Sequence, residues 1–242
     1  MAEDEIIKKH TQSVYNTWID PNKKWFHKLK DILQEIIIIV FAVSVSIWFH
    51  NWSESHKDQQ QEKAFLSGLK TDLQADLQEM KGDSGAYQIV LKGISYFRSV
   101  GAGEVLNTDS LKNYYWILFA SVHKQSRTSR FEALKGSGKL DIIENKELLG
   151  NIISLYQEIY SNISLGNKTF SDYIENRIGP LIDTHAKLDT ANNIVNWQDI
   201  LRNSEFRMGI FRANTVAQNI QAYSLGINKC GEIIKQIDKE LE

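Results

Sequence analysis

EIIIIVFAVSVSIWFHNW, residues 35–52, is the most apolar stretch of the chain. From Ile36 to Phe49 it contains no charged residue, and Ser44 and Ser46 are its only polar ones. A strand of that length is unusual, because strands commonly run about 5–6 residues. A helix in a soluble core should show a polar stripe with a period of about 3.6 residues. The pattern therefore favours a helix that lies in lipid, and the alternative is a buried helix of a soluble domain.

This helix is long enough to cross a bilayer. The hydrocarbon layer is about 30 Å thick, and about 20 helical residues cover it. Residues 33–52 supply that length and place Trp48 and Trp52 where indole rings favour the headgroup level, with Trp25 as a further interfacial anchor. A cleaved signal peptide fits poorly, because its charged leader is short and a small-residue cleavage site should follow. We expect an uncleaved transmembrane helix at residues 32–52.

Lysines around this helix predict its orientation. Lys23, Lys24, Lys28 and Lys30 precede it, whereas Lys57 and Lys63 are the only bases comparably close on the other side. The positive-inside rule then places the N-terminus in the cytoplasm and residues 53–242 outside it, as an extracytoplasmic domain. Residues 1–31 mix aromatic side chains with lysines, as expected of an amphipathic cytoplasmic arm on a membrane surface. A partly disordered leader is the alternative.

One face of the predicted membrane helix differs from the rest. Glu35, Ala42, Ser46 and His50 fall within about 80° of one another at about 100° per residue. Small residues four apart allow two helices to approach closely, and a carboxylate near the boundary is costly without a partner. We interpret the four residues as candidates for a helix–helix interface. The alternative is that Glu35 lies at headgroup depth and the serines bond to their own backbone.

The chain after this helix has helical patterns throughout. Leu66, Leu69, Leu73, Leu77 and Met80 predict the seam of a packed helix or coiled coil. The glycine-containing residues 82–85 should end that helix, and a second one should run from about 87 to 100. Thr108 or Asp109 is expected to cap a third helix.

The C-terminal half predicts further helices. A short helix near residues 130–135 should end at the glycine turn 136–138, and another should begin after Asn145 and continue towards Arg177, where Gly179 and Pro180 end it. A polar connection at about 183–193 leads to a last helix at about 204–241. Strand-like alternation is absent from the sequence. The expected fold is all-α, with an N-terminal transmembrane helix that continues into a multi-helix bundle.

Paired motifs in the chain resemble an uncharacterised family of small bacterial membrane-anchored proteins with a helical extracytoplasmic domain. The resemblance lies in EIIIIVFAVSVSIWFHNWSES, EKAFLSGLKTDLQADL and FEALKGSGKLDIIENKELLGNIISLY, which follow one another in the family's order. His50 departs from the family, where a second Asn is common, and Gly136 stands where a serine is usual. The resemblance implies architecture and inner-membrane placement, but no activity. The matching positions are Glu35, Asn51, Trp52, Glu54, Leu134, Lys135, Gly138, Glu147 and Leu148.

Composition and motifs argue against several function classes. A net charge of −2 over 242 residues does not favour nucleic acid as a partner. The single cysteine, Cys230, excludes an internal disulfide and a multi-cysteine metal site. The six histidines include no His-x-x-x-His pair, and nucleophile elbows and phosphate-binding loops are absent. We therefore predict no catalytic residue, no cofactor and no metal, and a protein that is not an enzyme.

Two surface features remain as candidate sites. Lys124, Arg127 and Arg130 gather beside an expected helix start and can hold a small phosphate or carboxylate, although such clusters are more often a solvated turn. The aromatic residues 114–116 and 119 cover more than one helix face, which indicates either core packing or a groove that contacts a protein.

These features lead to three hypotheses of function. The first is a membrane-anchored, non-enzymatic interaction protein whose partners are the lipid bilayer and another membrane or periplasmic protein, or a second copy of the chain. The second is a periplasmic module that senses a small anion near Arg127 and Arg130 and signals through a partner. The third, a hydrolase, lacks its constellation of residues.

Overall fold

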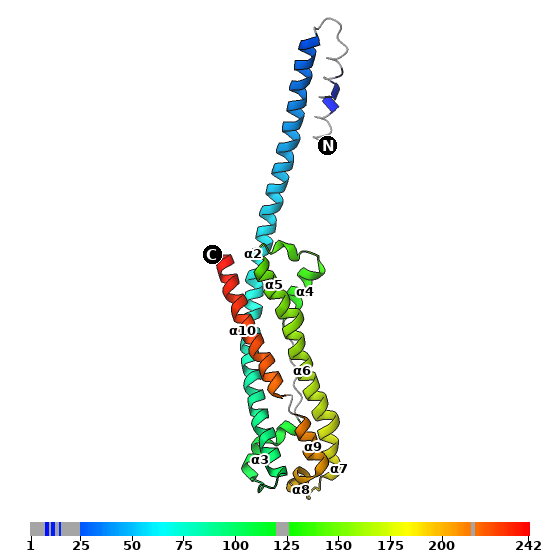
Figure 1. Cartoon of the computed structure of the whole chain (residues 1–242), viewed down its shortest axis with the longest axis vertical. Coiled ribbons are helices and arrows are strands. Elements are labelled where there is room, and N and C mark those ends of the chain that lie inside the picture. Colours follow the sequence, from blue (N-terminus) through cyan, green and yellow to red (C-terminus); the bar gives the residue numbers. More distant parts are fainter. Residues whose placement is uncertain (1–7, 10, 13–14, 16–24, 120–125, 214–215) are drawn as a thin grey trace. The chain divides into compact units, whose positions relative to one another are not determined.

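The computed structural model describes residues 8–9, 11–12, 15, 25–119, 126–213 and 216–242. Two compact units divide the chain at Gln61 and Glu62, and each is described by itself. Most of the predicted arm at residues 1–31 lies outside the described residues. Where the chain is described it is helical, and its only β feature is an isolated bridge between Leu188 and Ile194. The predicted all-α fold, with a long N-terminal helix that continues into a bundle, is confirmed (Figure 1).

Helix α2 (Trp25–Gly101) is one uninterrupted helix of 77 residues. The expectation that residues 82–85 end it is wrong. Gly82 and Gly85 are exposed and helical, and the backbone passes through them without a positive φ. The reason lies in the buried positions on either side: Met80 and Tyr87 are seven residues apart, so one heptad repeat bridges the glycines.

The buried seam of α2 follows a strict repeat of three and four residues. Leu77 was predicted to belong to this seam, but it is only half-buried. The fully buried residue at this point of the repeat is Asp76. With this correction the repeat holds from the first residue of the second unit to the end of the helix. Its members are Glu62, Leu66, Leu69, Leu73, Asp76, Met80, Asp83, Tyr87, Val90, Ile94, Phe97 and Gly101.

Short elements follow α2. Helix α3 (Thr108–Tyr114) is capped by Asn107, whose side chain accepts from the Ser110 amide at 2.8 Å, so the cap predicted at Thr108 or Asp109 is wrong. The 3-10 turn η1 (Tyr115–Phe119) leads to the undescribed residues 120–125. Helix α4 (Ser129–Gly136) ends in the predicted glycine turn, in which Gly138 has φ of +71°. The Gly138 amide donates to Lys135 O and the Lys139 amide to Leu134 O, which is a Schellman motif.

A helical run from residue 146 to 185 forms the second long rod of the bundle (Figure 1). It follows the short 3-10 turn η2 (Leu140–Ile142) and begins, as predicted, after Asn145, whose side chain caps it through the Leu148 amide. Two π turns interrupt its α geometry. Its segments are α5 (Lys146–Ser154), η3 (Leu155–Ile159), α6 (Tyr160–Tyr173), η4 (Ile174–Ile178) and α7 (Gly179–His185).

The expected end of this run at Gly179 and Pro180 is wrong. The Gly179 amide donates to Ile174 O across the π turn η4, and Pro180 lies in the first turn of α7. Proline is tolerated there because the first turn of a helix needs no donor from it. The spacing of buried residues also explains the π turn. Every fourth residue is buried here, and a step of four drifts around the face of an α-helix, whereas the wider π turn keeps such residues aligned. The buried residues are Phe170, Ile174, Ile178 and Ile182.

Three helices complete the chain: α8 (Trp197–Arg202), α9 (Ser204–Arg212) and α10 (Val216–Leu241). The single last helix predicted at 204–241 is wrong, because Ala213, with ψ of 7°, leaves the helical region. Ala213, Val216 and Asn219 are all buried at two successive steps of three, and a continuous helix would turn them off one face. Helix α10 packs against α5 and α6, and it lies beside the second half of α2 (Figure 1).

We predict that Gly82→Ala and Gly85→Ala each stabilise the second unit. A Cβ atom at either position meets nothing within 4 Å, so alanine removes the entropic disadvantage of glycine, about 0.5–1 kcal/mol in a helix interior. The measurement is the free energy of unfolding from denaturant titration followed by circular dichroism.

Gly93→Ala is the matched control. There a Cβ atom would lie 2.3 Å from Ile117 Cδ1, so the same substitution in the same helix should destabilise. If alanine at 82 and 85 lowered stability, the helix would have to be broken at these glycines.

Candidate functional site

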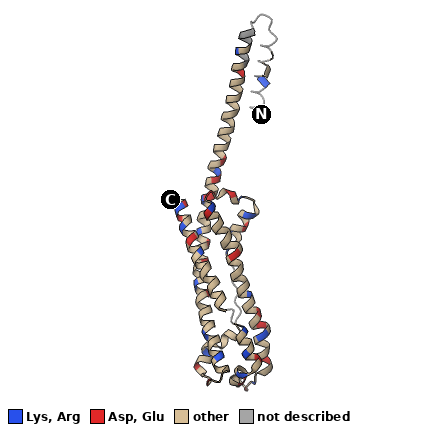
Figure 2. Cartoon of the chain, in the orientation of Figure 1, with Lys and Arg blue, Asp and Glu red and all other residues tan. Residues whose placement is uncertain are grey.

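The apolar segment at residues 33–52 lies entirely within α2, and its large side chains are exposed. Phe41 is 70 % exposed and Trp48 is 64 % exposed. The most apolar part of this helix is long enough to cross a membrane, and none of it is buried. Figure 2 shows a long stretch of α2 without charged residues, in keeping with the absence of Asp, Glu, Lys and Arg from residues 36–49. The other exposed apolar residues are Leu33, Ile36, Ile37, Ile38, Val40, Val43, Val45, Ile47, Phe49 and Trp52.

Glu35, Ala42, Ser46 and His50 share one face of this helix, as their spacing predicted. Glu35 and Ala42 are half-buried, whereas Ser46 and His50 are exposed. His50 Nε2 lies 3.9 Å from Glu54 Oε2, one turn further along. Their role as a helix–helix interface stays a prediction.

Of the predicted interfacial anchors, Trp48 and Trp52 lie at the C-terminal end of the segment, whereas Trp25 precedes the segment by eight residues. Trp25 is the first residue of α2. Trp52 stacks on His56 with ring centroids 6.2 Å apart, and Phe49 lies 5.6 Å from Trp52. This end of the segment therefore carries a continuous aromatic surface, which suits the interfacial zone of a bilayer.

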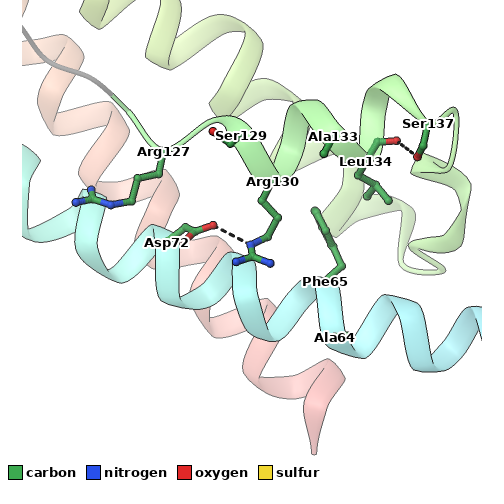
Figure 3. A pocket seen from close by; sticks show the side chains of 9 residues that line it. All are labelled: Ala64, Phe65, Asp72, Arg127, Ser129, Arg130, Ala133, Leu134 and Ser137. Atoms are coloured by element: carbon green, nitrogen blue, oxygen red, sulfur yellow. Dashed lines mark hydrogen bonds and ion pairs between the residues drawn. The ribbon is translucent and has the colours of Figure 1, made fainter.

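Arg127 and Arg130 line a shallow groove between α2 and α4, whereas Lys124 lies outside the described residues (Figure 3). Arg130 Nε donates to Asp72 Oδ2 at 2.8 Å. Gly68 permits this approach, because a Cβ atom there would lie 2.3 Å from Arg130 Cζ. Arg127 Nη1 donates to Asp76 Oδ1 at 2.7 Å and to Glu79 Oε2 at 3.1 Å.

These ion pairs bear directly on the predicted anion site. Each guanidinium group already has a carboxylate partner from α2, and the carboxylates beside Arg127 raise its pKa. A free anion would have to compete with Asp72, Asp76 and Glu79 for the same donors. The geometry favours a structural role for both arginines, and anion binding here stays a prediction.

Asp76 is the centre of a buried polar cluster that the sequence analysis missed. Its side chain is fully buried in the α2 seam. Tyr160 donates its hydroxyl hydrogen to Asp76 Oδ2 at 2.8 Å, and the Arg127 amide lies 3.4 Å from the same oxygen. The Tyr160 hydroxyl is also 3.4 Å from Cys230 Sγ. Through these contacts Asp76 connects α2 with the segment before α4, with the helical run 146–185 and, by way of Tyr160, with α10.

A second buried cluster lies one heptad further along α2. The Tyr87 hydroxyl donates to Asn167 Oδ1 at 2.9 Å, and Asn167 Nδ2 donates to the Tyr223 hydroxyl at 2.8 Å. Tyr223 in turn donates to Asp83 Oδ2 at 3.2 Å. Burial raises the pKa of Tyr87 to about 12, so both tyrosines remain neutral donors at physiological pH.

Glu62 is the third acid of the seam. Its Oε1 accepts a hydrogen bond from the Glu144 amide at 2.9 Å, which ties α2 to the turn before α5. Burial raises the pKa of the Glu62 carboxyl. The seam itself was the signal for all three acids: the three-and-four repeat of the apolar residues passes through 62, 76 and 83.

In the described part of the chain, no group of three or more His, Cys, Asp or Glu side chains could hold a metal ion. No family model matches the chain, and no curated protein or solved structure is significantly similar to it. The resemblance to small membrane-anchored proteins therefore stays a prediction, and functional inference rests on the geometry.

We predict that Tyr160→Phe destabilises the second unit by about 1–3 kcal/mol, the cost of leaving a buried acceptor short of a donor. The free energy of unfolding is the measurement.

Arg127→Gln should lower the melting temperature more than Arg130→Gln, because Asp76 is fully buried whereas Asp72 is 23 % exposed. Equal effects of the two arginine variants would contradict a structural role centred on Asp76.

Proposed function

We propose that the protein is a single-pass, non-enzymatic interaction protein of the bacterial inner membrane. Residues 32–52 form its membrane helix, its N-terminus lies in the cytoplasm, and its helical domain lies in the periplasm. The partner is another membrane or periplasmic protein, or a second copy of the chain. The lysine asymmetry and the resemblance to membrane-anchored proteins support this placement.

One observation carries the proposal: large apolar side chains are exposed over about two thirds of the circumference of α2 from Leu33 to Trp52, and only the face with Glu35, Ala42 and Ser46 lacks them. A core helix of a soluble domain would bury one of its faces. The second unit needs no contribution from this segment, because its apolar core begins at Phe65 and includes α10 up to Ile237. Lipid is the solvent that suits a helix with this surface.

We predict that the full chain remains in the membrane fraction of bacterial cells after carbonate extraction. Val43→Arg should reduce that fraction severalfold, because arginine at the centre of a span disfavours insertion by about 2.5–3.5 kcal/mol. Gln59→Arg, on the exposed part of α2 beyond the segment, is the matched control and should change nothing.

Orientation is measured on the same membranes with an impermeant maleimide. Lys57→Cys should react in spheroplasts, whereas Lys30→Cys should react only after permeabilisation; Cys230 is buried and contributes little background. The reverse labelling would overturn the topology, and a folded chain in the aqueous fraction would overturn the anchor.

The interaction itself is tested at the face that carries Ala42 and Ser46. We predict that crosslinking in membranes captures a reproducible complex, and that Ala42→Leu and Ser46→Leu weaken it because larger side chains separate closely packed helices. Val40→Leu and Ile47→Leu, on the opposite side, are the controls. A strictly monomeric chain without a captured partner would contradict the proposal.

A further inference from the structure

A second cavity lies in the second unit, where the C-terminal end of α2 meets α9. Its volume of about 490 Å³ falls within the range of about 300–1,000 Å³ that small-molecule sites occupy. It differs from the groove at Arg127 and Arg130 in both its walls and its charges. The lining residues are Phe97, Arg98, Ser204, Phe206, Arg207, Met208, Ile210 and Phe211.

The walls of this cavity are mainly apolar. Phe97 and Phe206 are each only 1 % exposed and belong to the core, so they present a fixed surface. Met208 and Phe211 are exposed at its rim. An apolar group that enters would be covered by core rings on one side and by movable side chains on the other, as is typical of ligand pockets.

Arg98 supplies a cation with unused donors. Its Nη2 donates to Phe211 O at 3.0 Å, and its guanidinium carbon lies 5.5 Å from the centre of the Phe211 ring. Its Nε is buried, and no hydrogen-bond partner is present within the described residues. A buried donor without a partner is costly, so an acceptor that reached this nitrogen would stabilise it, and the described residues do not supply one.

Arg207 supplies a second cation to the same cavity. Its Cγ packs beside Gly101, where a Cβ atom would lie only 3.1 Å away, so the glycine at the end of the α2 seam makes room for it. In the described part of the chain, neither Arg98 nor Arg207 forms an ion pair, and the cavity lining contains no carboxylate. Arg127 and Arg130, in contrast, are both neutralised by acids of α2.

We propose that this cavity binds a small organic carboxylate with an aromatic or aliphatic body. Arg98 and Arg207 bind the carboxylate group, and the rings of Phe97, Phe206 and Phe211 cover the apolar body. Arginine matches a carboxylate because its planar group donates two parallel hydrogen bonds. A purely inorganic anion fits this cavity less well, because it would leave most of the apolar walls without contact. This inference does not depend on the membrane anchor.

The test is a binding titration with 3-(4-fluorophenyl)propanoate observed by fluorine NMR. The full chain is placed in phosphatidylcholine nanodiscs, with empty nanodiscs as the reference, and the titration runs in plain buffer if the chain proves soluble without lipid. The carboxylate should bind saturably. Its amide, 3-(4-fluorophenyl)propanamide, and acetate should each bind about tenfold more weakly or worse, since one lacks the charge and the other the apolar body.

Variants locate the site. Arg98→Gln and Arg207→Gln should each weaken carboxylate binding about tenfold. Arg207 is exposed, so its variant is expected to fold, and circular dichroism checks both. Arg130→Gln is the matched control and should bind as the wild type does. Equal binding of acid and amide, absence of saturable binding to the folded wild type, or loss of binding in the Arg130 variant would each overturn the proposal.

Discussion

Three acids lie in the seam of α2, and each needs a hydrogen-bond partner from a neighbouring element. Glu62, Asp76 and Asp83 occupy positions of one three-and-four repeat whose other members are apolar or glycine. A buried carboxylate without hydrogen bonds is strongly unfavourable, so every neighbour of the seam has to present a donor at the right height. The Glu144 amide, the hydroxyl of Tyr160 and the hydroxyl of Tyr223 do so. A shift of one helical turn between α2 and the neighbouring helices would remove these donors from the buried carboxylates of Glu62 and Asp76, so these two acids favour a single register of the bundle. Asp83 is half-buried and depends less on its partner.

The same requirement explains details elsewhere in the second unit. The π turn η3 brings both Tyr156 and Tyr160 onto the buried side, where Tyr156 stacks on Phe131 at 4.6 Å and Tyr160 reaches Asp76. Arg127 is bound to Asp76 through both its amide and its guanidinium group, which fixes the start of α4. Arg127 and Arg130, which the sequence suggested as an anion site, thus form ion pairs with acids of α2 within the protein itself. The arginines with unused donors, Arg98 and Arg207, are far from each other in sequence and become neighbours only in the fold.

Much of the architecture followed from local patterns, and the errors have a common cause. The all-α fold, the helix start at Asn145 and the glycine turn at Gly138 depend on residues close in sequence, so the sequence sufficed for them. The breaks expected at Gly82 and Pro180 were wrong because glycine and proline were weighed by local propensity, whereas the spacing of buried residues across them decides. Asp76 was missed because Leu77 beside it is apolar. Its burial depends on Tyr160, 84 residues away in sequence, and no local pattern reports that partner.

Two parts of α2 follow different rules although they belong to one helix. From Glu62 onward a single stripe is buried and the remaining positions are largely polar or half-buried. From Leu33 to Trp52, twelve large apolar side chains are exposed, and they cover about two thirds of the circumference. Each such side chain left in water forgoes about 1.5–3 kcal/mol of burial free energy, so an aqueous environment for this segment would be very unfavourable. A single buried stripe is typical of a helix in a protein core, whereas exposed apolar side chains over most of the circumference are typical of a helix in lipid. This contrast within one continuous helix is the physical basis for proposing a membrane anchor.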